Sequence, residues 1–197
     1  MVTEVLRANS QNFSKIIVVQ GSPGVGKTTI ARKLSKDLDM GLLSKDDIKE
    51  LFFETMGNPV NAEESALYGR ASVDALYIAI RRFAEEGVSF ITENAFYASF
   101  AQSEFDSIVK DTGAGILQIF CYCNRDVHER RFTARIENGE RHKGHYDQGG
   151  SLKNYNKIAE TYKKLNNMTT FSVDTTTFGD KEYNRLLTQV KTLIVGS

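Results

Sequence analysis

The sequence of 197 residues lacks several features that would point to particular classes of protein. It has no excess charge, because 25 Lys and Arg residues balance 25 Asp and Glu residues. Overall charge therefore gives no support to broad nucleic-acid binding. We find no apolar stretch long enough to cross a membrane, no repeat and no low-complexity tract. Residues 1–14 are polar and show no apolar signal-peptide core, so we expect a cytoplasmic protein.

Cysteine is also scarce, with only Cys121 and Cys123, and both lie in an apolar run. Residues two apart on one strand share a face but are poorly placed for a disulfide with each other. A single Cys-x-Cys without a second ligand pair is a weak zinc signal as well. We therefore expect reduced thiols that pack in the core.

What the sequence does contain is an ordinary globular composition, with 41% hydrophobic and 25% charged residues. The length favours one domain over residues 1–197, and strand-like runs alternate with segments of helical periodicity, which predicts an α/β fold with a parallel sheet. Strands are expected at Ile16–Gln20, Gly41–Ser44, Val88–Thr92, Gly115–Tyr122 and Thr170–Val173. Helices are expected at Lys27–Leu38, Asp46–Thr55, Ala62–Glu86, Phe100–Lys110, Arg125–Ile136, Leu152–Lys164 and Lys181–Leu193.

The strongest motif follows the first expected strand. Residues 21–29 match the Walker A pattern G-x-x-x-x-G-K-[ST] at every fixed position. Glycines let backbone N–H groups turn toward an anion, and the helix after the loop adds the positive end of its dipole. Lys27 can reach the outer phosphates of a nucleotide, and the Thr28 hydroxyl can ligate Mg²⁺. The expected nucleotide-binding residues are Gly21, Ser22, Pro23, Gly24, Val25, Gly26, Lys27, Thr28 and Thr29.

The nucleotide is expected to be ATP rather than GTP. Guanine specificity normally needs an Asn-Lys-x-Asp loop, and the similar stretch Asn156–Ala159 lacks the aspartate. The chain is also too short for the extra elements of large ATP-driven motors. These absences favour a kinase over a regulatory GTPase.

An acidic pair, Asp46 and Asp47, follows the second expected strand. Carboxyl ends of parallel strands face the ligand crevice, and a carboxylate there can accept the proton of an attacking hydroxyl group. We expect Asp46 to be this general base, with Asp47 as the alternative, and either residue can cap the following helix.

The third expected strand is followed by Glu93 and Asn94. An acidic side chain in this position commonly orients the water shell of a metal ion. Thr28 and Glu93 are therefore the expected metal residues. A solvated strand-end carboxylate is the alternative interpretation of Glu93.

Two arginines, Arg131 and Arg135, are four residues apart and would share one face of a helix. An arginine there can neutralise charge that develops on a transferring phosphoryl group. A charged surface helix is the alternative, because acidic residues accompany them. The irregular segment Gly139–Gly150 follows as a lid or a disordered loop, and its residues His142, His145 and Asp147 give only weak evidence for a metal site.

Together these motifs resemble the small P-loop kinases of the zeta-toxin, polynucleotide 5′-kinase and chloramphenicol-phosphotransferase group, which are AAA_33-like ATP-binding proteins. The resemblance implies a three-layer P-loop NTPase fold, a five-stranded parallel sheet in the order 2-3-1-4-5 and a helical lid at about residues 125–150. It places Asp46 as the base, Lys49 where polynucleotide kinases have a substrate-side arginine, and Asn94 as a candidate substrate contact. Lys49 keeps the charge but loses bidentate phosphate recognition.

The same resemblance places the exit of the last strand beside the adenine, where Thr175 and Thr176 could contact the base, although turn formation explains both residues equally well. We expect an ATP-dependent phosphotransferase that uses Mg²⁺ and acts on a hydroxyl group of a small molecule or nucleotide-like acceptor. The alternatives are a zeta-toxin-like sugar-nucleotide kinase, a polynucleotide 5′-hydroxyl kinase, which neutral charge and Lys49 disfavour, and a non-catalytic ATP-binding module. The expected catalytic residues are Lys27, Asp46, Arg131 and Arg135.

Overall fold

The computed structural model describes residues 14–138, 142–145 and 161–195. Its strands are β1 (Lys15–Gln20), β2 (Gly41–Ser44), β3 (Phe90–Glu93), β4 (Gly115–Tyr122) and β5 (Thr169–Asp174). Its helices are α1 (Lys27–Leu38), α2 (Lys45–Met56), α3 (Ala62–Glu85), α4 (Ala98–Thr112), α5 (Arg125–Glu137) and α7 (Asp180–Val195). Of the helix expected at 152–164, residues 152–160 lie outside the described residues.

The five strands form one parallel sheet in the order β2-β3-β1-β4-β5, which confirms the predicted order. In this register Glu93 of β3 is opposite Ser44 of β2 and Val19 of β1. The carboxyl ends of the three strands therefore meet at one edge, where a parallel α/β sheet binds its ligands.

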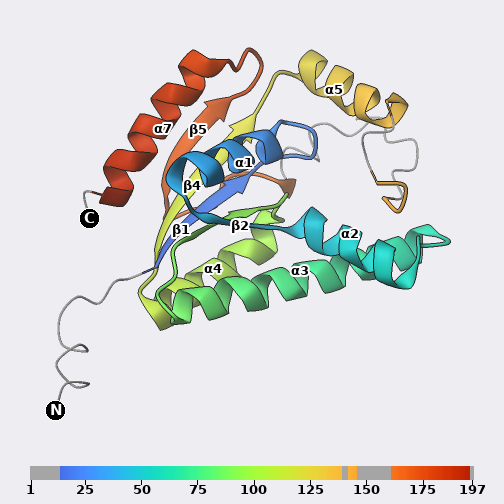
Figure 1. Ribbon diagram of the computed structural model, residues 1–197, viewed down its shortest axis with the longest axis horizontal. Coiled ribbons are helices and arrows are strands. Elements are labelled where there is room, and N and C mark those ends of the chain that lie inside the picture. Colours follow the sequence, from blue (N-terminus) through green and yellow to red (C-terminus); the bar gives the residue numbers. More distant parts are fainter. Residues whose placement is uncertain (1–13, 139–141, 146–160, 196–197) are drawn as a thin grey trace.

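Helices cover both faces of the sheet (Figure 1). Alternate residues of β1 point to opposite faces, so Ile17 and Val19 join a core formed with α1 and α7. Ile16 and Val18 join a second core formed with α3 and α4. This burial on both faces explains why residues 16–19 of β1 are all apolar, and it confirms the predicted three layers.

Element boundaries differ from the predictions where backbone hydrogen bonds extend or shorten an element. The Val88 N–H donates to the Phe83 carbonyl oxygen at 2.9 Å, so Val88 completes the end of α3 and β3 begins only at Phe90. Both α4 and β5 are longer than predicted. Within the described ranges, no helix is both long and apolar enough to cross a membrane.

The two cysteines are free and buried, as predicted. Cys121 is 1% exposed on β4, and burial raises the pKa of its thiol to about 12. Such a thiol stays protonated at neutral pH, which makes it a packing residue rather than a nucleophile.

Candidate active site

The Walker A segment forms a tight turn between β1 and α1, as predicted. Gly26 caps α1 in the left-handed region, with φ 88°. Gly21 has φ 142° and lies so close to the Cys121 carbonyl oxygen that a Cβ atom there would collide with it. The turn therefore needs glycine at these positions, and it delivers the N-terminus of α1 to the edge of the sheet.

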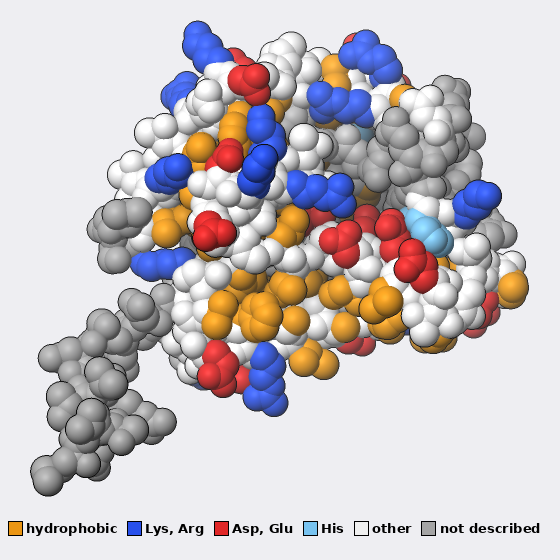
Figure 2. Space-filling view, in the orientation of Figure 1, with side chains coloured by type: hydrophobic (Ala, Val, Ile, Leu, Met, Phe, Trp, Pro, Cys, Tyr) orange, Lys and Arg blue, Asp and Glu red, His pale blue; other side chains and the backbone are white. Residues whose placement is uncertain are grey.

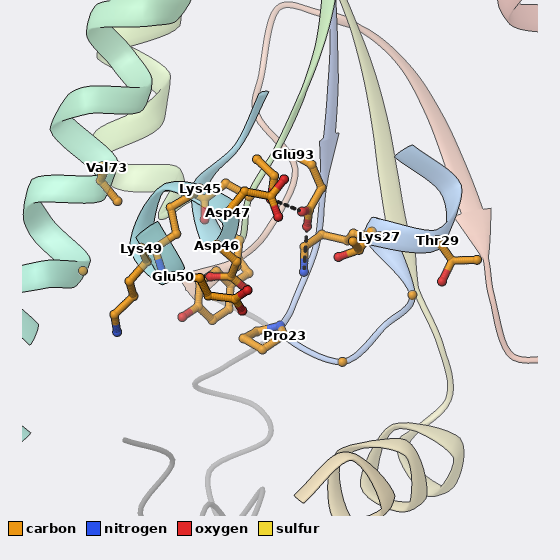
Figure 3. A pocket seen from close by; sticks show the side chains of 18 of the residues that line it. Pro23, Lys27, Thr29, Lys45, Asp46, Asp47, Lys49, Glu50, Val73 and Glu93 are labelled. Atoms are coloured by element: carbon orange, nitrogen blue, oxygen red, sulfur yellow. Dashed lines mark hydrogen bonds and ion pairs between the residues drawn. The ribbon is translucent and has the colours of Figure 1, made fainter. Parts of the chain in front are cut away.

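A cleft of about 1440 Å³ opens at this edge, and Figure 3 shows part of its wall from close by. One end of the cleft is formed by the Walker A turn together with α5 and the segment after β5. This end is lined by Pro23, Gly24, Gly26, Lys27, Thr28, Thr29, Arg131, Thr175 and Phe178. The other end lies between α2, α3 and the segment after β3. It is lined by Ser44, Lys45, Asp46, Asp47, Lys49, Glu50, Ser65, Arg70, Asp74, Asn94, Tyr97 and Tyr162, among others.

Lys27 and Glu93 meet in the middle of the cleft, where both side chains are about 7% exposed. The Lys27 ammonium group donates to the Ser22 carbonyl oxygen at 2.9 Å, and its nitrogen lies 4.0 Å from a Glu93 carboxylate oxygen (Figure 3). Ser44 donates to the other carboxylate oxygen at 3.2 Å. Glu93 is therefore a buried, hydrogen-bonded carboxylate rather than a solvated strand-end residue.

Burial raises the pKa of Glu93 above its ordinary value. The positive charge of Lys27 and the hydroxyl groups of Ser44 and Thr28 act in the opposite direction, and the negative charge of Asp46 adds to the increase. A raised carboxylate pKa inside a cleft is typical of a functional site. The side-chain oxygen atoms of Thr28 and Glu93, the two residues expected to hold a metal ion, thus lie close together.

The two aspartates at the start of α2, Asp46 and Asp47, have different surroundings. Asp46 lies 3.0 Å from the Lys45 ammonium group and close enough to Glu93 to influence its pKa. Asp47 is more exposed and lies 3.8 Å from Arg32 of α1. Figure 2 shows acidic side chains gathered over α2. Of the two aspartates, Asp46 is the one that interacts with the centre of the cleft.

Lys49 and Asn94 line the cleft as expected for substrate contacts. Lys49 is 8% exposed, donates to the Ser65 hydroxyl of α3 at 3.1 Å and lies over the Phe53 ring. Its ammonium group therefore sits at the contact between α2 and α3. The Asn94 N–H donates to the Val19 carbonyl oxygen at 3.3 Å, which fixes this residue at the end of β1.

The paired arginines lie on α5, where the sequence predicted a helix. The Arg131 guanidinium donates to the Thr175 hydroxyl at 3.2 Å and to the Thr175 carbonyl oxygen at 2.7 Å. One of its nitrogens lies 4.0 Å from the place a Cβ atom on Gly26 would take. Arg131 therefore stands over the Walker A turn. The side chain of Arg135 lies outside the described part of the protein.

The short segment 142–145 packs on α2. The His142 ring stacks on the Phe53 ring with centroids 5.1 Å apart, and His145 Nε2 lies 3.1 Å from a Glu50 carboxylate oxygen. Asp147 is outside the described residues. Among the residues that are described, no group of three or more His, Cys, Asp or Glu side chains could hold a metal ion.

Sequence reasoning missed two buried residues of this site, Ser44 and His128. Ser44 stands opposite Glu93 in the sheet, a register that a single sequence does not reveal. His128 is 1% exposed, and its Nε2 forms a short hydrogen bond with the Pro23 carbonyl oxygen. No pattern in the sequence predicts this contact, because it depends on how α5 packs against the Walker A turn.

The comparison with protein families gives one match that covers most of the chain. The family model described as an AAA domain, AAA_33, matches residues 16–149. Uncharacterized proteins of Mycobacterium tuberculosis and Mycobacterium bovis are 28% identical over 128 residues, which is 61% of this chain and 26% of theirs. The chain thus spans about a quarter of the length of the curated relatives it matches.

Solved structures with the same fold include several kinases. A protein of Chloroflexus aurantiacus proposed to be a kinase is 28% identical, with a TM-score of 0.80 over 92% of this chain and 98% of that one. Shikimate kinase from Bacteroides thetaiotaomicron gives a TM-score of 0.60 at 17% identity, covering 92% and 98%. The APS kinase of Mycobacterium tuberculosis, in complex with AMPPNP and APS, gives a TM-score of 0.55 at 16% identity, covering 93% of this chain and 98% of that one. These last two likenesses concern the fold alone.

Proposed function

Because the chain belongs to the AAA_33 family of AAA domains and has the fold of small P-loop kinases, we propose that it is an ATP-dependent kinase. It phosphorylates a hydroxyl group of a small polar acceptor. The observation that carries the proposal is that one cleft joins the Walker A turn to the carboxylates of α2. A nucleotide at one end and an acceptor at the other would share this space.

The nucleotide end of the cleft supplies positive charge to the phosphates. Lys27 and the N-terminus of α1 act on the outer phosphates, and Arg131 stands over the same turn. An APS kinase with the same fold has been seen with the ATP analogue AMPPNP, which supports the binding of a nucleotide by this fold. Arg135, one turn further along α5, is proposed to act on the transferring group.

Thr28 and Glu93 are the residues that would hold Mg²⁺. Their hydroxyl and carboxylate oxygens are the hard ligands that this ion prefers, and Ser44 keeps the Glu93 carboxylate oriented. Mg²⁺ in kinases takes few protein ligands because nucleotide phosphates and water complete its shell. When bound, it would neutralise charge on the phosphates.

Asp46 is the proposed general base at the acceptor end. It accepts the proton of the acceptor hydroxyl as that oxygen forms a bond to the γ-phosphorus of ATP, while the bond from phosphorus to the β–γ bridging oxygen breaks. ADP leaves with that electron pair. The closeness of Asp46 to Glu93 supports this role, since it puts the base beside the expected metal.

The charges at the acceptor end favour a small acceptor over a nucleic acid. Two of the cations there, Lys45 and Lys49, already contact Asp46 and Ser65, and further carboxylates from α2 and α3 line the same wall. A polynucleotide needs an excess of positive charge along its track. Lys49 and Asn94 are proposed to contact the small acceptor instead.

A screen for acceptor-dependent ADP release tests the proposal. Purified protein with MgATP is offered sugars, sugar acids, aminoglycosides, nucleosides and 5′-hydroxyl oligonucleotides. We expect at least one small hydroxyl compound to raise ADP release well above the rate with ATP alone, and Lys27→Ala to abolish the increase. Tight ATP binding without any acceptor-dependent release would instead support a non-catalytic nucleotide-binding module, and a response only to oligonucleotides would identify an end kinase.

A further inference from the structure

The Walker A turn has two carbonyl groups that receive hydrogen bonds from distant parts of the chain. The Pro23 carbonyl oxygen is contacted by His128 Nε2, and the Val25 carbonyl oxygen accepts from the Thr175 hydroxyl at 2.7 Å. A carbonyl oxygen only accepts, so Nε2 of His128 carries a proton and donates it. Both donors are almost fully buried, with 1% and 2% exposure.

These contacts have a direct physical consequence for anion binding. A loop that turns its N–H groups toward a phosphate must turn its carbonyl groups the other way, into the protein. A buried carbonyl without a donor costs free energy. His128 and Thr175 supply donors to two of these carbonyl groups, so they favour the backbone conformation that a phosphate needs.

The donors lie in or directly after regular secondary structure. His128 lies in the first turn of α5, and its backbone N–H donates to the Asn124 carbonyl oxygen at 3.0 Å. Thr175 directly follows β5, and its N–H bonds to the Tyr122 carbonyl oxygen of β4 at 2.7 Å. The turn is therefore held from two elements that are far from it in the sequence.

Thr175 also orders Arg131, which donates to its hydroxyl and to its carbonyl oxygen. The single proton of the Thr175 hydroxyl points to main-chain carbonyls, with Val25 at 2.7 Å and Tyr122 at 3.0 Å. No hydroxyl proton is left for a contact with adenine. This arrangement disfavours the base-contact role that the sequence suggested for this threonine.

We infer that His128 and Thr175 are positioning residues, which hold the Walker A turn in its anion-binding conformation before the nucleotide arrives. The inference rests on the proposed binding of ATP but not on phosphoryl transfer. Holding a loop in its bound conformation raises affinity because the ligand does not have to order it.

Calorimetric binding of three probes tests the role of Thr175. The probes are ATP, inorganic tripolyphosphate, which engages the phosphate end of the site without the base, and adenosine, which engages only the base site. Thr175→Val removes the hydroxyl at nearly constant volume. We expect this variant to weaken the binding of ATP and of tripolyphosphate by the same factor of about ten, the effect of one hydrogen bond. The affinity for adenosine should not change. Thr175→Ser should restore both affinities.

A matched control is Thr188→Val on α7. The Thr188 hydroxyl also bonds to a main-chain carbonyl, that of Asn184, at 2.9 Å, but this residue is exposed and does not line the cleft. Its affinities for all three probes should equal those of the wild type. His128→Leu gives a second, independent variant, which should weaken tripolyphosphate, while His128→Gln retains an N–H donor and should bind more tightly than His128→Leu.

Three results would overturn the inference. Loss of ATP or adenosine affinity in Thr175→Val, with tripolyphosphate unchanged, would assign Thr175 to the base. Unchanged affinities for every probe in both Thr175→Val and His128→Leu would show that the turn needs neither donor. A wild-type chain that binds neither ATP nor tripolyphosphate would remove the nucleotide site itself, whereas a chain that binds both but transfers nothing would refute only the proposed kinase activity.

Discussion

Replacing Lys27 by methionine should destabilise the protein in a manner that depends on pH. Methionine keeps most of the apolar length of the side chain but removes the ammonium group. In the folded protein this group donates to the Ser22 carbonyl oxygen at 2.9 Å and lies 4.0 Å from the Glu93 carboxylate. The variant leaves Glu93 buried, with the hydroxyl groups of Ser44 and Thr28 but without its cation.

The size of the effect follows from these distances. A unit charge pair at 4 Å interacts by about 4 kcal/mol at an effective dielectric constant of 20. A hydrogen bond from a charged donor contributes about 1.5–3 kcal/mol. Removing the buried ammonium group also avoids several kcal/mol of desolvation, which offsets much of the loss. For Lys27→Met we therefore expect a net loss of about 2 kcal/mol in the free energy of unfolding near neutral pH.

The sign of the pH dependence is set by Glu93. Burial already raises its pKa and Lys27 lowers it, so Lys27→Met raises the pKa further. A carboxylate with a raised pKa in the folded state binds its proton there before it does in the unfolded chain. The stability of Lys27→Met relative to the wild type therefore increases as the pH falls through the raised pKa of Glu93. It is lost again as the pH rises, by at most about 1.4 kcal/mol per pH unit.

Urea unfolding at several values between about pH 5 and pH 8 measures this difference. The deficit of Lys27→Met relative to the wild type should be largest at the alkaline end and shrink toward the acid end. The double variant Lys27→Met with Glu93→Gln should be more stable than Lys27→Met alone at neutral pH, because it removes the buried carboxylate that has lost its cation. A deficit that is constant across pH, or a double variant no more stable than Lys27→Met, would refute the reasoning.

Three further predictions concern neighbouring residues. Gly21→Ala should lower the free energy of unfolding by about 2–4 kcal/mol, because its Cβ would meet the Cys121 carbonyl oxygen at a left-handed φ; a loss in urea unfolding below about 0.5 kcal/mol would contradict this. Ser44→Ala removes a hydrogen bond that lowers the pKa of Glu93, so the acid limb of the plot of kcat/KM against pH should move to higher pH. An acid limb that does not move would show that activity does not depend on the ionisation of Glu93. Arg131→Met should raise the KM for ATP about tenfold with little change in the KM for the acceptor. Steady-state kinetics that show a raised KM for the acceptor and an unchanged KM for ATP would mean that Arg131 binds the acceptor instead.

The Walker A turn could be predicted because its chemistry is local. Residues 21–29 have a fixed spacing between a buried strand and a helix, and the glycines are required by the backbone itself. The alternation of strands and helices likewise predicted the α/β class. The strand order came from the resemblance alone, because pairing between distant strands leaves no mark in a single sequence.

The rest of the site depends on packing that one sequence does not reveal. Ser44 reaches Glu93 only because β2 pairs with β3 in one particular register. In the sequence, His128 is one polar residue among the many charged residues of α5, yet its ring is buried against the Walker A turn. The resemblance placed Lys49 at the position of a substrate-side arginine. It did not show that the Lys49 ammonium group bonds to Ser65 across the contact between α2 and α3.

The most direct test of the central claim follows the phosphoryl group itself. ATP labelled at the γ-phosphate is incubated with the protein and the best acceptor from the screen, and the label is located in the products. The account predicts that the label moves to a hydroxyl group of the acceptor, and that Asp46→Asn lowers this rate by about 100-fold or more while ATP affinity stays within about twofold. Release of the label only as inorganic phosphate, or transfer at the wild-type rate by Asp46→Asn, would contradict it.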